Sequence, residues 1–425
     1  MVTMGSRAPT KRTAVATRSH ERDHDPSQRS ILMVAPAWPY PPTWGFATRV
    51  YHLAKELAKR HRVSLLTYGR VGAALGEAAA MFESVDVVAS PVAETSKRRR
   101  QARSVFSARS AHLGGLRSDQ MIAAVANLLA QRRFDLVQLE STQMAFCGAV
   151  TDAPVALDEH NVEYLLLKRL ASAESVPARK AFGYLEAAKA RREEVRAWRR
   201  ADGVIFTSSA DLEVMRVSMP DKSGCVVPNG VDVERFKPSD MVPEPHTVVF
   251  TGAINYRPNT DAVAFFVRDV LPRLRRLQRS TRFVVVGRGA PDWLVRMAGP
   301  EVEFTGEVPD VRPYLARAHV VVAPLRAGSG TRLKILEAMA MGKPVVSTAI
   351  GCEGLRVVDG EDISIADDPQ ALAESTAHLM SHPARAIELG RNARLLAERD
   401  YSWPVVAQRL DNFHSQLLSK ETRVG

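Results

Sequence analysis

The sequence predicts an α/β protein built from two doubly wound, Rossmann-like domains that face each other across a cleft. Short apolar runs alternate with segments of helical periodicity from residue 31 onward. Uninterrupted apolar strands separated by helices are typical of a parallel sheet covered on both faces. The chain of 425 residues is also too long for one ordinary core. A Pro-rich polar segment near residue 240 separates two such series of elements.

The first series starts with the apolar run ILMVA at 31–35, which leads through PAWPYPPTWG into a helix. In that helix the apolar residues recur with i, i+3, i+4 spacing, at Val50, Leu53, Ala54, Leu57 and Ala58. Further strands are expected at 63–67, 135–140, 154–158 and 203–207, with helices around 119–132 and 161–200.

The second series follows the polar segment, which we interpret as a linker at 237–246. Strands are expected at 247–252, 282–287, 302–306, 319–324 and 344–348, with helices near 259–276, 310–317 and 330–342. In open sheets of this kind ligands lie at the carboxyl ends of the strands. Two facing sheets would enclose a cleft there, so functional residues are sought in the loops after the strands.

The charge of the chain is strongly positive, with 58 Lys and Arg against 47 Asp and Glu, or +11. Much of the excess lies in residues 1–29, which have few large apolar side chains and are predicted to be a disordered leader, and in the segment 96–110. These charges are either simply solvated or attracted to an anionic membrane surface. Nucleic acid is not expected as a partner, because no aromatic residues or recognition motif accompany the charges.

Several other functions are disfavoured by composition. No apolar run approaches the roughly 20 residues of a membrane span, and the first 30 residues lack the apolar segment of a signal peptide. A cytoplasmic protein is therefore expected. The three cysteines are widely spaced and form no metal-binding pair, so they are interpreted as ordinary reduced residues.

The segment PLRAGSGTRLKILEAMAMGKPVVST at 324–348 carries the first candidate site. Its two glycines allow a ligand to approach the backbone, and the amides of a helix starting near Thr331 would stabilise an anion such as a phosphate. Of the two cations, Lys334 is favoured over Arg332 because it shares a helix face with Glu337. The alternative is a Gly-rich turn with solvated charges and an i, i+3 ion pair between Lys334 and Glu337.

The loop FTGAINYRPNTDAVAFF has a similar design after the first strand of the second domain. Gly252 ends the strand, Pro258 suits the first positions of a helix, and Arg257 places a cation at that helix start. A surface arginine beside a proline is the alternative. Two such loops on one sheet edge favour binding of a diphosphate.

These motifs resemble the family-4 retaining glycosyltransferases of group 1, which have the GT-B fold. CVVPNGVDVERFKP at 225–238 resembles their interdomain signature, and GSGTRLKILEAMAMGKPVVST resembles their donor-binding helix. LDEHNVEY at 157–164 is similar to the segment in which they carry a histidine near the sugar. The segments WPYPPTWGFATRVYHLAKELAKRHRVSLLT and FTGAINYRPNTDAVAFF look closest to the sugar transferases of exopolysaccharide and exosortase systems.

The resemblance implies a domain division and a set of site residues. The first domain would span 30–236 and be completed by 402–420, and the second, which binds the nucleotide sugar, would span 247–401. Glu337 matches the glutamate that typically holds the ribose, whereas Ser329 stands where the family has another glutamate. Arg257 matches one cation of the family's pair, and no lysine follows it, so Arg332 and Lys334 are expected to substitute. The implied donor-binding set is Gly45, Gly252, Arg257, Gly328, Ser329, Gly330, Thr331, Arg332, Lys334 and Glu337.

In the first domain the resemblance implies that Gly45 brings backbone amides toward the donor phosphates. His160 is expected to contact the donor sugar or the acceptor hydroxyl and, with Glu337, forms the predicted catalytic pair, although a hydrogen-bonded structural histidine is the alternative. Asp158 is expected to be structural.

The predicted activity is transfer of a hexosyl group from a UDP- or GDP-sugar to a glycan or lipid-linked acceptor. Retention and independence of metal ions and other cofactors are implied by the resemblance. The basic segments suggest work at the inner membrane face. Two alternatives stay open: a sugar-nucleotide epimerase of the same fold, and a non-catalytic nucleotide-sugar-binding protein.

Overall fold

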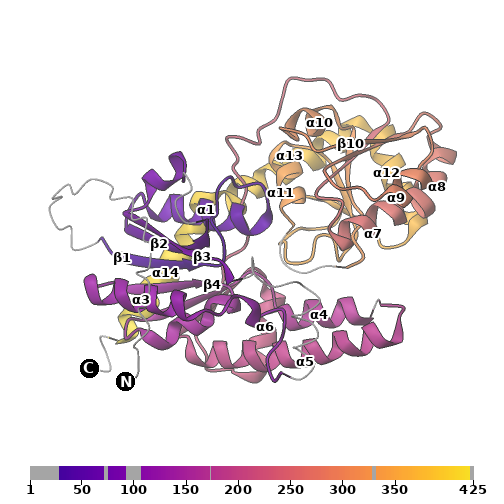
Figure 1. The fold of residues 1–425 in the computed structure, drawn as a ribbon. Helices are drawn as coiled ribbons and strands as arrows, with labels where there is room; N and C mark the ends of the chain where they lie inside the picture. The colour runs from indigo at the N-terminus through magenta and orange to yellow at the C-terminus, as the bar shows by residue number, and fades with distance from the viewer. Residues whose placement is uncertain (1–27, 71–74, 92–106, 173, 328–331, 422–425) are drawn as a thin grey trace, which may run out of the picture. The chain divides into compact units, whose positions relative to one another are not determined.

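The structure, a computed structural model, describes residues 28–70, 75–91, 107–172, 174–327 and 332–421 (Figure 1). Most of the predicted leader, most of the basic segment 96–110 and the loop residues 328–331 lie outside the described residues. The chain divides into two compact units. Unit 1 comprises 1–206, 212–225 and 410–425, and unit 2 comprises 207–211 and 226–409. Among the described residues, no helix combines the length and hydropathy that a membrane crossing requires.

Unit 1 contains a seven-stranded sheet in the order β3-β2-β1-β4-β5-β6-β7. The strands are β1 (Ser30–Ala35), β2 (Arg62–Gly69), β3 (Ser84–Ala89), β4 (Leu136–Glu140), β5 (Val155–Glu159), β6 (Gly203–Phe206) and β7 (Gly224–Val226). All pairings from β3 to β6 are parallel. The helices are α1 (Gly45–Leu57), α3 (Asp119–Gln131), α4 (Glu163–Ser172) and α5 (Pro177–Arg200), with short 3₁₀ segments at Glu77–Met81, Gly114–Leu116 and Thr142–Val150. Helix α6 (Ser209–Ser218) begins in unit 2 and continues in unit 1.

Unit 2 contains a six-stranded parallel sheet in the order β10-β9-β8-β11-β12-β13. The strands are β8 (Thr247–Thr251), β9 (Arg282–Val286), β10 (Val302–Gly306), β11 (Val320–Ala323), β12 (Val345–Ser347) and β13 (Ser364–Ile365). The helices are α7 (Arg257–Phe265), continued by a π turn at Phe266–Val270 and by α8 (Leu271–Leu277), then α9 (Asp292–Met297), α10 (Arg312–Arg317), α11 (Leu333–Ala340), α12 (Pro369–Ser381) and α13 (Pro383–Tyr401). Helix α14 (Trp403–Glu421) begins in unit 2 and ends in unit 1.

The central strands are buried along their whole length, as the apolar runs predict. In β1, the side chains of Ile31, Leu32, Met33 and Val34 are fully buried. Every residue of β8 and β11 is buried as well. The ten strands expected from the sequence are all present within one or two residues of their predicted bounds. This agreement confirms the predicted α/β class with two parallel sheets.

Three strands were not predicted, for a common reason. β3 carries Asp86 and is only partly buried at the edge of its sheet, β7 has three partly buried residues, and β13 has two. Edge strands lack the continuous apolar run that marks a central strand. The helix expected at 161–200 is also wrong as one element, because it is divided into α4 and α5, and Pro177 begins the second helix.

The domain limits differ from those expected at 236 and 402. Val231 and Phe236 are buried in the apolar core of unit 2, so the segment 226–236 belongs to that unit. At the other end, a side chain on Gly230 would collide with the Trp403 ring, which places the start of α14 in unit 2 as well. The division falls where the apolar contacts change and not at the Pro-rich segment.

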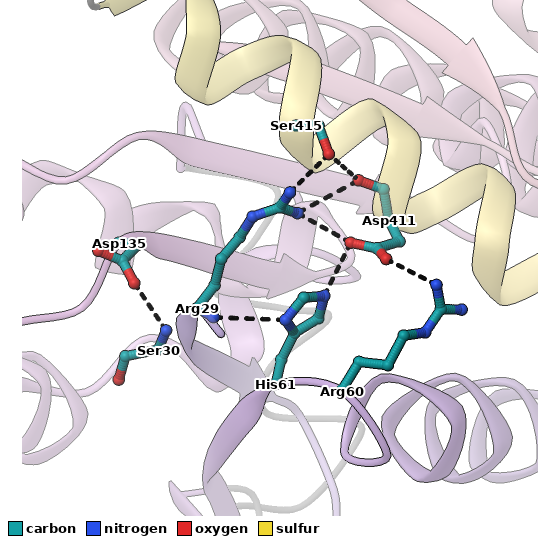
Figure 2. A network of polar contacts seen from close by, with 7 residues as sticks. All are labelled: Arg29, Ser30, Arg60, His61, Asp135, Asp411 and Ser415. Atoms are coloured by element: carbon teal, nitrogen blue, oxygen red, sulfur yellow. Dashed lines mark hydrogen bonds and ion pairs between the residues drawn. The ribbon is translucent and has the colours of Figure 1, made fainter. Parts of the chain in front are cut away.

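A network of polar contacts joins the second half of α14 to unit 1 (Figure 2). Asp411 accepts from Arg29 Nη1 at 2.8 Å and from His61 Nε2 at 2.8 Å, and Arg60 Nη1 lies 3.2 Å from its other oxygen. Arg29 Nη2 also donates to Ser415 Oγ at 2.6 Å. Assignment of Arg29 to a disordered leader was therefore wrong, because its side chain is fixed by α14.

The ring of His61 has a defined tautomer in this network. The backbone amide of Arg29 donates to Nδ1 at 3.3 Å, so Nε2 carries the proton that it donates to Asp411 (Figure 2). Beside it, the backbone amide of Ser30 donates to Asp135 at 2.7 Å. The start of β1 is thus anchored on both sides.

Candidate functional site

In unit 2 the strand order reverses between β8 and β11, since the chain passes from β8 outward to β9 and β10 and then returns to β11 on the other side. Loops that leave the carboxyl ends of such neighbouring strands diverge, which leaves room for a ligand. Gly252 follows β8 directly, and the loop after β11 leads to α11. The strand ends from which the two predicted donor loops leave are therefore neighbours at the reversal point of this sheet.

Lys334 reaches from the first turn of α11 to the end of β8. Its Nζ donates to Asn259 Oδ1 at 2.8 Å and lies 3.8 Å from the centroid of the Phe250 ring. A Cβ on Gly252 would lie only 2.8 Å from the same nitrogen. Burial lowers the pKa of Lys334 to about 7, with the charge of Arg332 acting in the same direction. The Lys334 ammonium group is thus held against the backbone of Gly252 by two neutral side chains, Asn259 and Phe250.

Gly252 is required by its surroundings as well as by its conformation. Its φ is +143°, which side-chain-bearing residues rarely adopt. Gly287, at the end of β9, is equally constrained, because a Cβ there would come within 1.8 Å of the Gly252 carbonyl oxygen. Glycine at both positions lets the ends of β8 and β9 pack against each other and lets the Lys334 ammonium group lie against the backbone of Gly252.

Glu337 lies one turn after Lys334 on α11 and is partly buried. Burial raises the pKa of its carboxyl to about 7, although the charges of Lys334 and Arg235 oppose this. Among the described residues, Lys334 hydrogen-bonds to Asn259 and does not form the alternative i, i+3 ion pair with Glu337. Glu337 is therefore placed near the cation but is not neutralised by it.

The other unit 2 residues of the predicted donor-binding set are not shown to lie against Lys334 and Gly252. Helix α11 begins at Leu333 and not near Thr331, and Arg332 is an extended cap residue, so the argument from helix faces does not apply to it. Arg257 begins α7 and is exposed. The positions of Gly328, Ser329, Gly330 and Thr331 lie outside the described residues.

In unit 1 the order reverses between β1 and β4, and a second cluster lies at that edge. Gly45 begins α1 in the loop after β1 and is exposed, Glu140 ends β4, and His160 follows β5. His160 Nε2 lies 3.0 Å from Glu140 Oε2, and Gln138 Nε2 donates to the other oxygen at 2.6 Å. Burial raises the pKa of Glu140, whereas the hydrogen bond with His160 lowers it.

Asp158 forms a buried ion pair with Arg49, a partner that the sequence did not predict. Arg49 of α1 donates to both of its carboxylate oxygens, Nε at 2.9 Å and Nη2 at 2.8 Å, and both side chains are buried. Ligand atoms of Glu140, Asp158 and His160 lie within 4.8 Å of one another, a spacing that could suit a metal ion. Because the Arg49 guanidinium pairs with Asp158, the charge of that carboxylate is already balanced by the protein itself.

An aromatic stack leads from solvent to His160. The Phe46 ring lies 5.0 Å from the imidazole with an interplanar angle of 26°, and the Trp44 ring lies 5.1 Å beyond it at 27°. Half of the Trp44 surface is exposed. The aromatic residues of WPYPPTWGF are the only sign of this stack in the sequence. The sequence alone does not reveal that they stack on a histidine more than a hundred residues away.

Two protein families match the chain. Residues 45–235 match the family described as Glycosyltransferase Family 4, and residues 245–382 match the family described as Glycosyl transferases group 1. The matched segments include both clusters described above, together with β8, β11 and α11 of unit 2.

Curated proteins similar to this chain include enzymes named for the synthesis of different glycans and glycolipids. A lipopolysaccharide core biosynthesis mannosyltransferase of Rhizobium leguminosarum bv. viciae is 29% identical, over 55% of this chain and 71% of its own length. A glycogen synthase of Mycobacterium tuberculosis is 30% identical, over 50% of this chain. A phosphatidyl-myo-inositol mannosyltransferase of Mycobacterium leprae is 28% identical, over 47%. The alignments span 54% of the glycogen synthase and 55% of the last enzyme, about half their length.

Solved structures resemble the chain over nearly all of its length. A sucrose-phosphate synthase from Thermosynechococcus elongatus has a TM-score of 0.69 at 17% identity, covering 92% of this chain and 100% of that one. Anabaena HepE in complex with UDP has a TM-score of 0.66 at 16% identity, covering 91% of this chain and 100% of that one. At these identities the likeness shows the fold, which is the two-sheet GT-B arrangement.

Proposed function

Because the chain belongs to the group 1 glycosyltransferases with the GT-B fold, we propose that it moves a hexosyl group from a UDP- or GDP-sugar to a hydroxyl of a glycan or lipid-linked acceptor. In this reaction the bond between C1 of the sugar and the diphosphate breaks, and the electron pair stays on the diphosphate. The acceptor oxygen bonds to C1 and loses its proton. Stabilising the departing diphosphate is the main electrostatic requirement.

The observation that carries the proposal is the position of Lys334 against Gly252 at the reversal point of the unit 2 sheet. A diphosphate bound there would meet an ammonium group held by Asn259 and a backbone without a side chain in the way. Binding of the anion would offset the burial that lowers the pKa of Lys334, so the group would be fully protonated in the complex. Glu337 is proposed to hold the ribose, as the family resemblance implies.

In unit 1, His160 is proposed to act on the sugar or on the acceptor hydroxyl. Its hydrogen bond with Glu140 fixes the plane of the ring, and Phe46 covers one face of it. Retention of configuration and a role in exopolysaccharide or other cell-surface glycan synthesis are also proposed. The names of the relatives that act on lipopolysaccharide and phosphatidylinositol support a glycan or lipid-linked acceptor.

The first test is thermal unfolding of the wild type with UDP, GDP and ADP in turn. A ligand that binds only the folded state stabilises it by about 2.7 kcal/mol at a hundredfold excess over Kd. We expect one nucleotide to raise the unfolding temperature of the wild type and to do so much less in Glu337→Ala. The control Glu374→Ala removes an exposed carboxylate of unit 2 and should respond as the wild type does. A protein that responds to no nucleotide would contradict the donor site.

The second test follows the matching nucleotide sugar with and without an added glycan acceptor. A transferase forms a glycosidic product only when the acceptor is present. Epimerised or free sugar without an acceptor would favour the epimerase of the same fold. Nucleotide binding without turnover, across donors and acceptors, would favour the non-catalytic binding protein.

A further inference from the structure

Helix α5 directs its acidic side chains toward the protein. It is 24 residues long, or about 36 Å. Glu186 accepts from the Ser110 hydroxyl at 3.1 Å and from the next backbone amide at 2.7 Å, and Glu193 accepts from the Ser110 amide at 2.9 Å. Glu194 accepts from the first two backbone amides of α4, both at 2.7 Å. All three carboxylates of α5 therefore accept hydrogen bonds from other parts of unit 1.

The opposite face of α5 is exposed and has two chemically different halves. A subset of the exposed positions recurs every three or four residues and makes one continuous stripe along the helix, and Arg179, Arg191 and Arg200 are exposed outside it. The first half of this face is apolar and the second half is cationic. We define the α5 face as Ala181, Tyr184, Leu185, Ala188, Arg192, Arg196 and Arg199. No acidic residue of α5 is exposed.

Among the residues that the structure describes, the cations of the α5 face form no close ion pairs, although the charge of Arg196 acts on the nearby Glu193 carboxyl and opposes the burial that raises its pKa. In the described part of the chain, Arg192, Arg196 and Arg199 form no ion pair, nor does the exposed Arg200 beside them. Tyr184 and Leu185 are 40% and 41% exposed. Helix α4 packs along α5 and exposes Lys168 and Arg169 of its own (Figure 1).

Local helix energetics account for part of this pattern only. Arg199 lies in the last turn, where a cation is favoured by the helix dipole. Arg192 and Arg196 begin before that turn, and the dipole gives no reason to expose Tyr184 and Leu185. Solvated charge explains neither the apolar half nor why two of the three carboxylates of α5 are buried and the third, Glu193, is only partly exposed.

Apolar side chains and tyrosine next to unpaired arginines match the interface of an anionic bilayer. Tyr184 and Leu185 would enter the headgroup boundary, and the arginines would contact lipid phosphates. A nucleic acid would need several aromatic side chains for base stacking, and the α5 face has one. We propose that the α5 face docks this protein on the surface of an anionic lipid bilayer. The proposal is independent of the glycosyl transfer proposed above.

The test is sedimentation of the full chain with vesicles at low ionic strength. We expect binding to phosphatidylcholine vesicles containing about 30% phosphatidylglycerol, little binding to phosphatidylcholine alone, and loss of binding at high salt. Reversing three charges in Arg192→Glu, Arg196→Glu, Arg199→Glu should lower the partition coefficient at least about tenfold. Tyr184→Ser with Leu185→Ser should weaken binding but leave its salt dependence unchanged.

The matched control reverses three exposed arginines of unit 2, in Arg276→Glu, Arg279→Glu, Arg296→Glu. It makes the same change in net charge and should bind vesicles as the wild type does. Wild-type binding by the α5 variant, or an equal loss in the control, would overturn the proposal and assign binding to net charge or to the basic segments outside the described residues. Tighter binding to duplex DNA than to the anionic vesicles would also overturn it. An unchanged circular dichroism spectrum and an unfolding temperature close to that of the wild type show that each variant is folded.

Discussion

At the scale of single residues, Lys334 is the group with the clearest functional consequence. Its pKa is lowered to about 7, so near neutral pH it is only partly charged before a ligand binds. A bound diphosphate favours the charged form, and binding must then take up protons above pH 7. The pH dependence of nucleotide affinity therefore reports on this side chain.

We predict that the affinity for the preferred nucleoside diphosphate falls by up to about tenfold per pH unit above pH 7. Lys334→Arg should keep measurable binding without this pH dependence, because arginine stays charged. Lys334→Met should bind weakly at all pH values. Isothermal titration calorimetry in buffers of different ionisation enthalpy measures both the affinity and the proton uptake. Equal pH dependence in the wild type and Lys334→Arg would contradict this role.

Glu140 gives the second prediction at this scale. Glu140→Gln removes the carboxylate that orients His160, and we expect kcat to fall at least about tenfold with a small change in the donor KM. Burial raises the pKa of Glu140, so wild-type activity should fall as the pH drops through that pKa, and this acidic limb should be absent in the variant.

The control for Glu140→Gln is Glu163→Gln. It removes a second carboxylate that pairs with a histidine, since Glu163 lies 2.8 Å from His112 Nε2. Its pH profile of kcat should resemble that of the wild type. An acidic limb that persists in Glu140→Gln would assign the titration to another group.

At the scale of elements, α14 is held to unit 1 by Asp411. Although burial by itself raises its pKa, the hydrogen bond from His61 and the charges of Arg29 and Arg60 lower the pKa of Asp411 below its ordinary value. A carboxyl with a lowered pKa contributes stability above its unfolded pKa, and this contribution is lost as the pH falls through the folded pKa. The contacts of α14 with unit 1 are thus weakened by acid.

We predict that Asp411→Asn lowers the free energy of local opening by about 2 to 4 kcal/mol at pH 7, because three cationic or hydrogen-bonding partners lose a charged acceptor. Hydrogen exchange in α14 and β1 measures the change, which should shrink toward pH 3. Asp400→Asn removes a carboxylate that pairs with the largely exposed Arg399 and lies 3.7 Å from Arg409, and it should cost less than about 1 kcal/mol. Equal effects of the two substitutions would contradict the role of the network.

The sequence predicts the interior elements of each sheet but not the contacts that build the sites. Strands β1, β8 and β11 are predictable because their apolar runs are buried on both faces. The pairing of Lys334 with Asn259, and of Arg49 with Asp158, joins residues 75 and 109 positions apart. Such pairings depend on which strands are neighbours in the sheet, and a single sequence does not contain that information.

The start of α11 shows a second limit. Gly and Thr before Arg332 suggest a helix from about Thr331, yet Arg332 has an extended backbone and α11 begins one residue later. Helix ends depend on contacts of the capping residues, which local composition describes poorly. This difference affects the candidate site. Arg332 lies before the first helical residue, so its direction cannot be compared with that of Lys334 by helix geometry.

At the scale of the whole molecule, the balance of charges predicts how the enzyme responds to metal chelation. Arg49 neutralises Asp158 within the only cluster of potential metal ligands found among the described residues. We predict that transfer activity is unchanged after dialysis against EDTA and on addition of Mg²⁺ or Mn²⁺, as measured by release of nucleoside diphosphate. Loss of activity with EDTA that Mn²⁺ restores would contradict the prediction and point to a metal-bound donor.

The path of α14 also determines the order in which the protein is completed during synthesis. Arg29 and Asp411 are separated by 382 positions, and unit 2 residues 226–409 are translated between them. Arg29, Arg60 and His61 emerge from the ribosome long before their shared acceptor exists. The sheet of unit 2 is therefore complete while unit 1, although begun first, still waits for its last helix. The part of the protein that is translated first is the last to be finished.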